Sequence, residues 1–341
     1  MTRDSSNVLE VRDLRTYFHL PEGTLKAVDG VDLTIEPGQT VGVIGESGSG
    51  KSVTAQSILQ IITPPGAIES GEVILRSSDG NLVDLARLNP RSSEIRAIRG
   101  AEISMVFQEP MTSLSPVHTI GAQIVEAIEL HITRDKCKAR SLALDMINRV
   151  GISNPEQRYD EYPHQLSGGM RQRAMIAMAL SCSPSLLIAD EPTTALDVTV
   201  QAQILELMKE LQEEFGMAVM YITHDLGVIA EIADVVNVMY LGRVVERAST
   251  IELFKNPLHP YTQRLLSSIP RLGRRGQGRL DAIRGSVPVP MNPPPQCGFA
   301  SRCDDFIAGK CDRAVPSLVE MGNEHFVRCY LHNEESEPIY A

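Results

Sequence analysis

The stretch VGVIGESGSGKSVTAQ, residues 41–56, decides the fold. It runs from an apolar, β-branched segment through a glycine-rich turn into a sequence typical of a helix. Residues 45–52 satisfy G-x-x-x-x-G-K-[ST], a loop whose backbone N–H groups bind phosphate oxygens at the start of a helix. In this pattern Lys51 reaches the terminal phosphates and Ser52 offers its hydroxyl to Mg²⁺. The residues expected to bind the nucleotide here are Gly45, Glu46, Ser47, Gly48, Ser49, Gly50, Lys51, Ser52 and Val53.

A second apolar segment, residues 186–189, ends in the acidic pair Asp190 and Glu191. Taken alone, such a pair is most typical of the negative charge that precedes a helix. With a phosphate-binding loop upstream, we expect Asp190 to hold Mg²⁺ through its water shell and Glu191 to orient or deprotonate the attacking water.

Strand and helix patterns alternate along the chain, which predicts an α/β fold with a mostly parallel sheet. The expected strands are residues 8–14, 26–44, 101–107, 185–190 and 217–223. The expected helices are residues 51–62, 119–131, 135–150 and 198–215, and a short one from Leu226. We place one domain at 1–255, with a helical subdomain at about 109–182, and a C-terminal extension at 256–341. The composition changes in this extension, which contains the proline-rich run 287–295.

Composition narrows the class of function. The 341 residues carry a formal net charge of −11, which lacks the basic excess of a protein that binds nucleic acid. No apolar run approaches the roughly 18 residues needed to span a bilayer, and the first residues do not form a signal peptide. We therefore expect the chain in the cytoplasm, with any membrane role acting through a partner.

The segment LSGGM, residues 166–170, resembles the signature sequence of ABC ATPases. Ser167, Gly168 and Gly169 would form a second anion site at a helix N-terminus. Other markers of that family follow its order: the Q-loop glutamine, the D-loop aspartate, the switch histidine and the aromatic residue that stacks on adenine. They are Gln108, Asp197 within 195–197, His224 and Phe18, with Tyr17 as an alternative to Phe18.

This resemblance implies a P-loop NTPase core with an antiparallel β subdomain and a helical subdomain. It also implies a head-to-tail dimer, in which the phosphate loop of one subunit and the signature of the other enclose each ATP. The catalytic residues would be Glu191, His224 and Gln108, and the Mg²⁺ site would use Ser52, Gln108 and Asp190. Asp197 and the signature would complete the ATP site of the partner.

Two longer stretches, residues 107–126 and 256–270, look like the ATPase subunits of oligopeptide, dipeptide and nickel importers. That resemblance implies an ATPase at the cytoplasmic face of the inner membrane that drives peptide uptake. Its partners would be a second homologous ATPase subunit, two transmembrane permease subunits and an extracellular binding protein. Nickel and oligosaccharides remain open as cargo. A soluble ABC ATPase without a transporter is the competing interpretation, which the single cassette and the lack of sustained heptads disfavour.

Four of the six cysteines lie in the C-terminal extension, at Cys297, Cys303, Cys311 and Cys329. In a reducing compartment such a group is more often a metal site than a disulfide framework. The spacing C-x5-C-x7-C-x17-C lacks the tight pairs of common zinc sites, so spacing alone leaves zinc, iron–sulfur and no metal open. The importer resemblance implies a [4Fe–4S] cluster, with structural zinc as the alternative.

Overall fold

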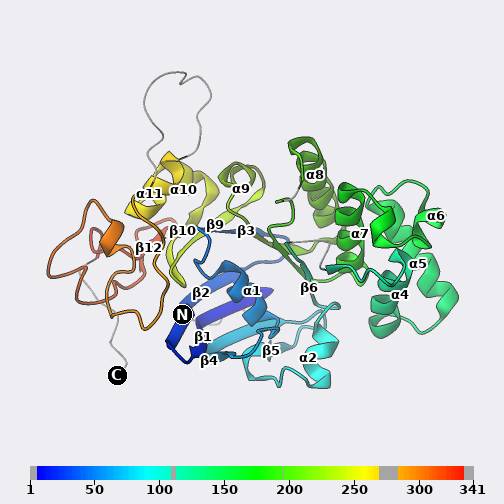
Figure 1. Ribbon diagram of the computed structural model, residues 1–341, viewed down its shortest axis with the longest axis horizontal. Coiled ribbons are helices and arrows are strands. Elements are labelled where there is room, and N and C mark those ends of the chain that lie inside the picture. Colours follow the sequence, from blue (N-terminus) through cyan, green and yellow to red (C-terminus); the bar gives the residue numbers. More distant parts are fainter. Residues whose placement is uncertain (1–5, 109–112, 195, 269–282, 334–341) are drawn as a thin grey trace. The chain divides into compact units, whose positions relative to one another are not determined.

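The computed structural model describes residues 6–108, 113–194, 196–268 and 283–333 (Figure 1). The chain divides into two compact units. Unit one comprises residues 1–9, 35–39 and 75–221, and unit two comprises residues 10–34, 40–74 and 222–341. Within the described ranges, no helix has both the length and the apolar character needed to cross a bilayer.

Unit one contains three neighbouring strands in the order β8-β7-β6. They are β6 (Ile103–Val106), β7 (Leu186–Asp190) and β8 (Ala218–Ile222). Strands β6 and β7 run parallel, with Ile103 opposite Leu186. Every residue of β7 and β8 is buried, as expected for strands of a parallel sheet that is covered on both faces. The predicted α/β core is confirmed.

The helices of unit one form a group that Figure 1 shows in green. They are α4 (Ile120–His131), α5 (Lys136–Arg149), α6 (Pro155–Tyr159), α7 (Gly168–Leu180) and α8 (Val198–Phe215). The short strand β5 (Leu82–Asp84) and helix α2 (Ser93–Ile98) precede this group in the chain. Helix α5 packs against α4, α6 and α7. Side chains of Thr119, Asp135 and Ser167 accept backbone N–H groups at three of the helix starts, which explains where these helices begin.

Unit two contains an arm of three strands in the order β2-β1-β4: β1 (Leu9–Leu20), β2 (Gly23–Ile35) and β4 (Gly66–Arg76). A two-residue turn joins β1 to β2, so these strands run antiparallel. The single strand predicted at 26–44 is wrong, because Pro37 and Gly38 form a turn that separates β2 from β3 (Thr40–Ile44). Gly38 has φ +70°, the left-handed conformation that glycine readily adopts in such turns.

The rest of unit two is a sheet in the order β11-β12-β10-β9-β3 with helices around it. Its further elements are β9 (Val235–Tyr240), β10 (Arg243–Ser249), β11 (Val319–Glu320), β12 (Phe326–Val327), α1 (Lys51–Ile58), α9 (Leu226–Ile232), α10 (Thr250–Lys255), α11 (Pro260–Ser267) and the 3-10 turn η3 (Ala300–Arg302). Strands β3 and β9 are parallel, and the other pairs are antiparallel. Helix α1 ends before the predicted residue 62, because Gln60 adopts φ +52°.

Within unit two, the C-terminal part of the chain pairs with strands β2 and β10. The proline-rich run lies along β2, where Pro290 accepts the Lys26 N–H at 3.1 Å and Asn292 donates its N–H to Thr24 at 2.9 Å. Gly23 has φ +145°, which favours glycine, and a Cβ atom there would lie 2.4 Å from the Asn292 side chain. Farther along, β12 pairs with β10.

Candidate functional site

The phosphate loop of unit two lies between β3 and α1, as the sequence predicts. Gly45 and Gly50 have φ of +152° and +101°. A Cβ atom at Gly45 would lie 2.2 Å from the Met239 carbonyl, and one at Gly50 would lie 2.3 Å from the Ala27 carbonyl. Both positions therefore need glycine for conformation and for space.

Lys51 is the first residue of α1 and is buried, at 6% exposure. Its Nζ donates to the carbonyl oxygens of Gly45 at 2.8 Å and Glu46 at 3.1 Å, which folds the side chain back over the loop. Ser52 and Val53 follow in the first turn of α1 and are half-buried. The N–H groups of a first helical turn have no intrahelical partner, so this end of α1 offers donors to an anion.

Glu46 has partners that sequence reasoning missed. Its N–H donates to the Tyr261 hydroxyl at 2.9 Å, and Arg302 donates to both oxygens of its carboxylate at 2.7 and 3.1 Å. The hydrogen bond to Glu46 raises the pKa of Arg302, although burial opposes that shift. Tyr261 and Arg302 lie more than 200 residues from Glu46 in the sequence, and no motif links them to it.

In unit one, Asp190 ends β7 and is 5% exposed, and Glu191 follows it with φ +48°. A left-handed glutamate is uncommon and carries some backbone strain. Gln108 Nε2 donates to Glu191 Oε2 at 3.0 Å, so the structure brings these two predicted residues together. Thr194 Oγ1 donates to the same oxygen at 2.9 Å. Sequence reasoning missed Thr194, and its place three residues after Glu191 was the available signal.

The signature and the D-loop also lie in unit one. Ser167 caps α7 and accepts the Met170 N–H at 3.3 Å, while Ser167 and Gly168 are exposed. Asp197 caps α8 by accepting the N–H groups of Thr199 and Val200. A Cβ atom at Gly169 would lie 3.0 Å from Val200, so the starts of α7 and α8 are neighbours. Ala195 of the D-loop lies outside the described residues.

In unit two, His224 follows β8 and is exposed, and Asp225 caps α9 directly after it. The half-buried Phe18 lies on β1, with its ring against Gly66: a Cβ atom there would lie 2.6 Å from the ring. Successive strand residues point to opposite faces, so the neighbouring Tyr17 faces elsewhere.

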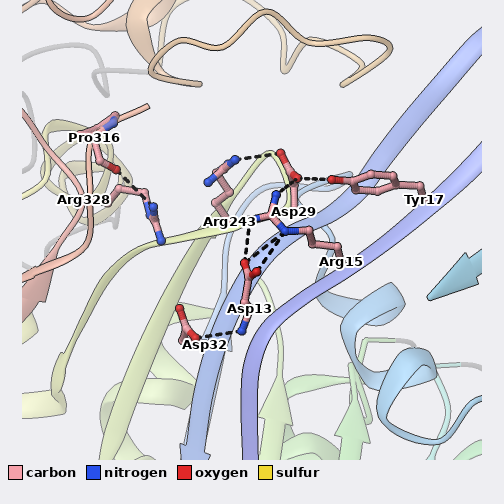
Figure 2. A network of polar contacts seen from close by, with 8 residues as sticks. All are labelled: Asp13, Arg15, Tyr17, Asp29, Asp32, Arg243, Pro316 and Arg328. Atoms are coloured by element: carbon pink, nitrogen blue, oxygen red, sulfur yellow. Dashed lines mark hydrogen bonds and ion pairs between the residues drawn. The ribbon is translucent and has the colours of Figure 1, made fainter. Parts of the chain in front are cut away.

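Figure 2 shows that Tyr17 belongs to a polar network around Asp29. The Tyr17 hydroxyl donates to Asp29 at 2.5 Å, and Arg243 contacts the other carboxylate oxygen at 2.9 Å. Burial and the bond to Asp29 raise the pKa of Tyr17 to about 12. Burial alone would raise the pKa of Asp29, but Arg243 and the Tyr17 hydroxyl lower it. Tyr17 is thus engaged by this network, whereas Phe18 is not.

The four extension cysteines gather in unit two, and none forms a disulfide. Burial, with a smaller contribution from the neighbouring thiols, raises the pKa of Cys297 to about 12 and of Cys329 to about 11. Each sulfur accepts a backbone N–H: Ile307 donates to Cys311 at 3.4 Å, and Phe299, Asp305 and Leu331 donate to Cys297, Cys303 and Cys329. In the part of the chain that the structure describes, no group of three or more His, Cys, Asp or Glu side chains is arranged to hold a metal ion.

Comparison with known proteins agrees with this geometry. The profile of the ABC transporter family matches residues 28–194, and that of the oligopeptide/dipeptide transporter C-terminal region matches residues 245–311. A putative peptide import ATP-binding protein of Brucella melitensis is 51% identical over 334 residues, covering 96% of this chain and 98% of that protein. The oligopeptide transport ATP-binding protein AppD of Bacillus subtilis is 51% identical over 331 residues, covering 97% and 98%.

Among solved structures, the dimeric ATP-binding cassette MJ0796, in a post-hydrolysis state bound to ADP and Pi, is similar with a TM-score of 0.62 and 27% identity. The match covers 71% of this chain and 98% of that cassette. The chain therefore belongs to the ABC transporter family, in the group of ATP-binding proteins that carry the oligopeptide/dipeptide transporter C-terminal region.

Proposed function

We propose that this chain is the ATP-hydrolysing subunit of a peptide importer. The observation that carries the proposal is the pair of donors from Gln108 and Thr194 to Glu191, because together they fix the orientation of the expected catalytic carboxylate. The peptide cargo rests on the relatives, which are named for peptide import or for oligopeptide and dipeptide transport.

The residues of the phosphate loop fit an ATP phosphate chain. The loop closes around the ammonium group of Lys51, and the start of α1 adds the N–H groups of a helix N-terminus. Ser52, Gln108 and Asp190 offer the hard oxygen ligands that Mg²⁺ prefers, and the bound ion would neutralise charge on the phosphates. Phe18 would stack on adenine, Glu191 would orient or deprotonate the attacking water, and His224 would act beside the terminal phosphate.

Each ATP would also need a second cassette. Ser167 and Gly168 are exposed at the start of α7, so they are accessible to a phosphate bound by another subunit. Asp197 would lie beside that phosphate in the assembled dimer. The partners that we propose are a second homologous ATPase, two permease subunits and an extracellular binding protein, with the cassette of residues 1–255 at the cytoplasmic face and the extension 256–341 appended to it.

The test is the substitution Glu191→Gln in the complex purified with its membrane subunits. Glutamine has the same shape but is a very poor base, so we expect ATP turnover to fall at least about a hundredfold while ATP affinity stays within about twofold. Glu206→Gln, an exposed carboxylate of α8, is the matched control and should turn over ATP normally. Undiminished turnover in Glu191→Gln would contradict the role assigned to Glu191. If no permease subunits co-purified with the chain, the proposed partners would be contradicted.

We further propose that the extension cysteines hold a [4Fe–4S] cluster. The support is the chemistry of the residues rather than an arrangement around an ion: the four thiols would repel one another once ionised, and a cationic centre would stabilise the thiolates. An N–H donor at each sulfur supports ligation further, because hydrogen bonds to the sulfurs stabilise and tune such clusters. The bound cluster would be structural, joining segments that lie 32 residues apart in the chain, from Cys297 to Cys329.

Anaerobic purification of the full chain tests this second proposal. We expect a brown protein with about four iron and four sulfide per chain, both lost when any one of the four cysteines is changed to serine. Cys137→Ser, at an exposed position of α5, is the control and should keep its colour. A colourless product loaded with zinc, or holding no metal, would refute the cluster.

A further inference from the structure

Arg302 of the extension forms a two-pronged ion pair with Glu46, the second residue of the phosphate loop. Nη1 lies 2.7 Å from Oε2 and Nη2 lies 3.1 Å from Oε1. The Arg302 side chain is 5% exposed, so solvent screens this pair far less than a surface pair. Such a paired geometry fixes both the position and the plane of the carboxylate.

The same glutamate is held through its backbone. Its N–H donates to the Tyr261 hydroxyl, and its carbonyl oxygen accepts from Lys51 Nζ at 3.1 Å and from the Ser49 N–H at 3.2 Å. The orientation of the Glu46 peptide therefore sets where the Lys51 ammonium and the turn of the loop lie. A group that controls Glu46 controls the two parts of the loop that bind phosphate.

Arg302 is itself held in place. Its Nη1 donates to the Tyr240 hydroxyl at 3.2 Å, and its Nε donates to the Arg284 carbonyl at 2.8 Å. The guanidinium carbon lies 5.8 Å from the centre of the Tyr240 ring and 6.0 Å from that of Phe299. Tyr240 and Phe299 also contact each other and Tyr261, so the two side chains that reach Glu46 share one aromatic cluster.

Arg302 and Phe299 lie in the loop between the first two extension cysteines. Phe299 follows Cys297 by two residues, and Arg302 directly precedes Cys303. Backbone bonds from Ala300 to Cys297 at 3.0 Å and from Arg302 to Phe299 at 2.9 Å make this loop a compact turn. Ligation of Cys297 and Cys303 by a bound cluster would therefore fix both ends of the turn that contains Arg302.

We propose that Arg302 is a positioning residue for ATP binding, through which the cysteine extension sets the affinity of the phosphate loop for nucleotide. The inference rests on the proposed ATPase function and gives the extension a role in that same site. Arg302 touches no nucleotide in this scheme, because it acts through Glu46.

The test measures binding of a fluorescent ATP analogue with Mg²⁺ to the full chain. We expect Arg302→Ala to weaken affinity about tenfold, in the range for loss of a charged, paired hydrogen bond. Arg302→Lys should fall between this variant and the wild type, since a lysine keeps the charge but not the fork. The control is Arg313→Ala, an exposed arginine of the same extension, which should stay within about twofold. In the assembled complex, KM for ATP should rise in Arg302→Ala while kcat at saturating ATP changes less than twofold.

A double-mutant cycle separates positioning from a general loss of structure. Glu46→Gln should weaken binding to a similar degree, and the double variant should be no weaker than either single one, because both changes break the same pair. Losses that add up, or an Arg302→Ala variant that binds as tightly as the wild type, would overturn the positioning role. Failure of the wild-type chain to bind ATP at all would instead refute the proposed function.

Substitution of an extension cysteine tests the link between the extension and Arg302 separately. Cys303→Ser should weaken ATP binding when Arg302 is present and add nothing when Arg302→Ala is already in place. Iron content, measured in parallel, reports on the cluster alone, so a chain without iron that still shows the Arg302 effect keeps this inference while refuting the cluster. If Cys303→Ser weakened ATP binding equally in the wild type and in Arg302→Ala, the extension would not act through Arg302.

Discussion

Glu191 shows how single residues combine to orient one functional group. Its left-handed backbone turns the side chain away from the direction that a strand would give it, and two donors then hold one of its carboxylate oxygens. Gln108 is recognisable from the sequence as a family marker, whereas the only sequence signal for Thr194 is its place three residues after Glu191. The orientation of the carboxylate therefore depends on a residue outside the known motifs.

Replacing Thr194 tests this dependence. Thr194→Val keeps the shape but removes the donor to Glu191, and a hydrogen bond to a charged group contributes about 1.5–3 kcal/mol. We expect kcat of the complex to fall about tenfold while ATP affinity is unchanged, and Thr194→Ser to restore most of the activity. Steady-state turnover measures both, and a normal kcat in Thr194→Val would show that Gln108 alone is sufficient.

At the scale of elements, strand β10 holds the start of α11. The carboxylate of Glu246, which is fully buried on β10, accepts the N–H groups of Leu258 and His259 and contacts His325 at 2.8 Å. His259 then caps α11, because its Nδ1 accepts the Tyr261 N–H at 3.0 Å. This chain of contacts sets the position of Tyr261, and so of the hydroxyl that binds Glu46.

Acid should loosen this part of unit two. Burial, with a smaller contribution from nearby His332, lowers the pKa of His259 to about 3. An unfolded histidine titrates near about 6.5, so between pH 6.5 and 3 the unfolded chain binds a proton that the folded chain does not. The free energy of unfolding should thus fall as pH drops through this window, by up to about 1.4 kcal/mol per pH unit, and should not change from this cause above it.

Urea unfolding at pH 7, 5.5 and 4.5 measures this slope. His259→Asn is the matched variant, because asparagine caps a helix but does not titrate. Its acid-induced loss of stability should be smaller than that of the wild type. Equal slopes in the two chains would assign the acid sensitivity to other groups.

At the scale of the whole molecule, the sequence predicts what is local and misses what is distant. The strand before Lys51 and the strand before Asp190 are apolar runs next to a motif, and both lie where the sequence indicates. Strands β4, β9 and β10 were not predicted, because no motif marks them. The contact of Arg302 with Glu46 joins positions 256 residues apart, and the pairing of β12 with β10 depends on tertiary contacts that no local pattern encodes. The boundary near residue 255 stays a prediction.

The proline-rich run also affects how chains meet one another. Strand β2 is the end strand of the order β2-β1-β4, and an open strand edge is a template for pairing with another chain. The run covers that edge beside Thr24 and Lys26, and proline has no N–H to offer to a further strand. The same segment that attaches the extension therefore ends the sheet, which protects this edge against aggregation.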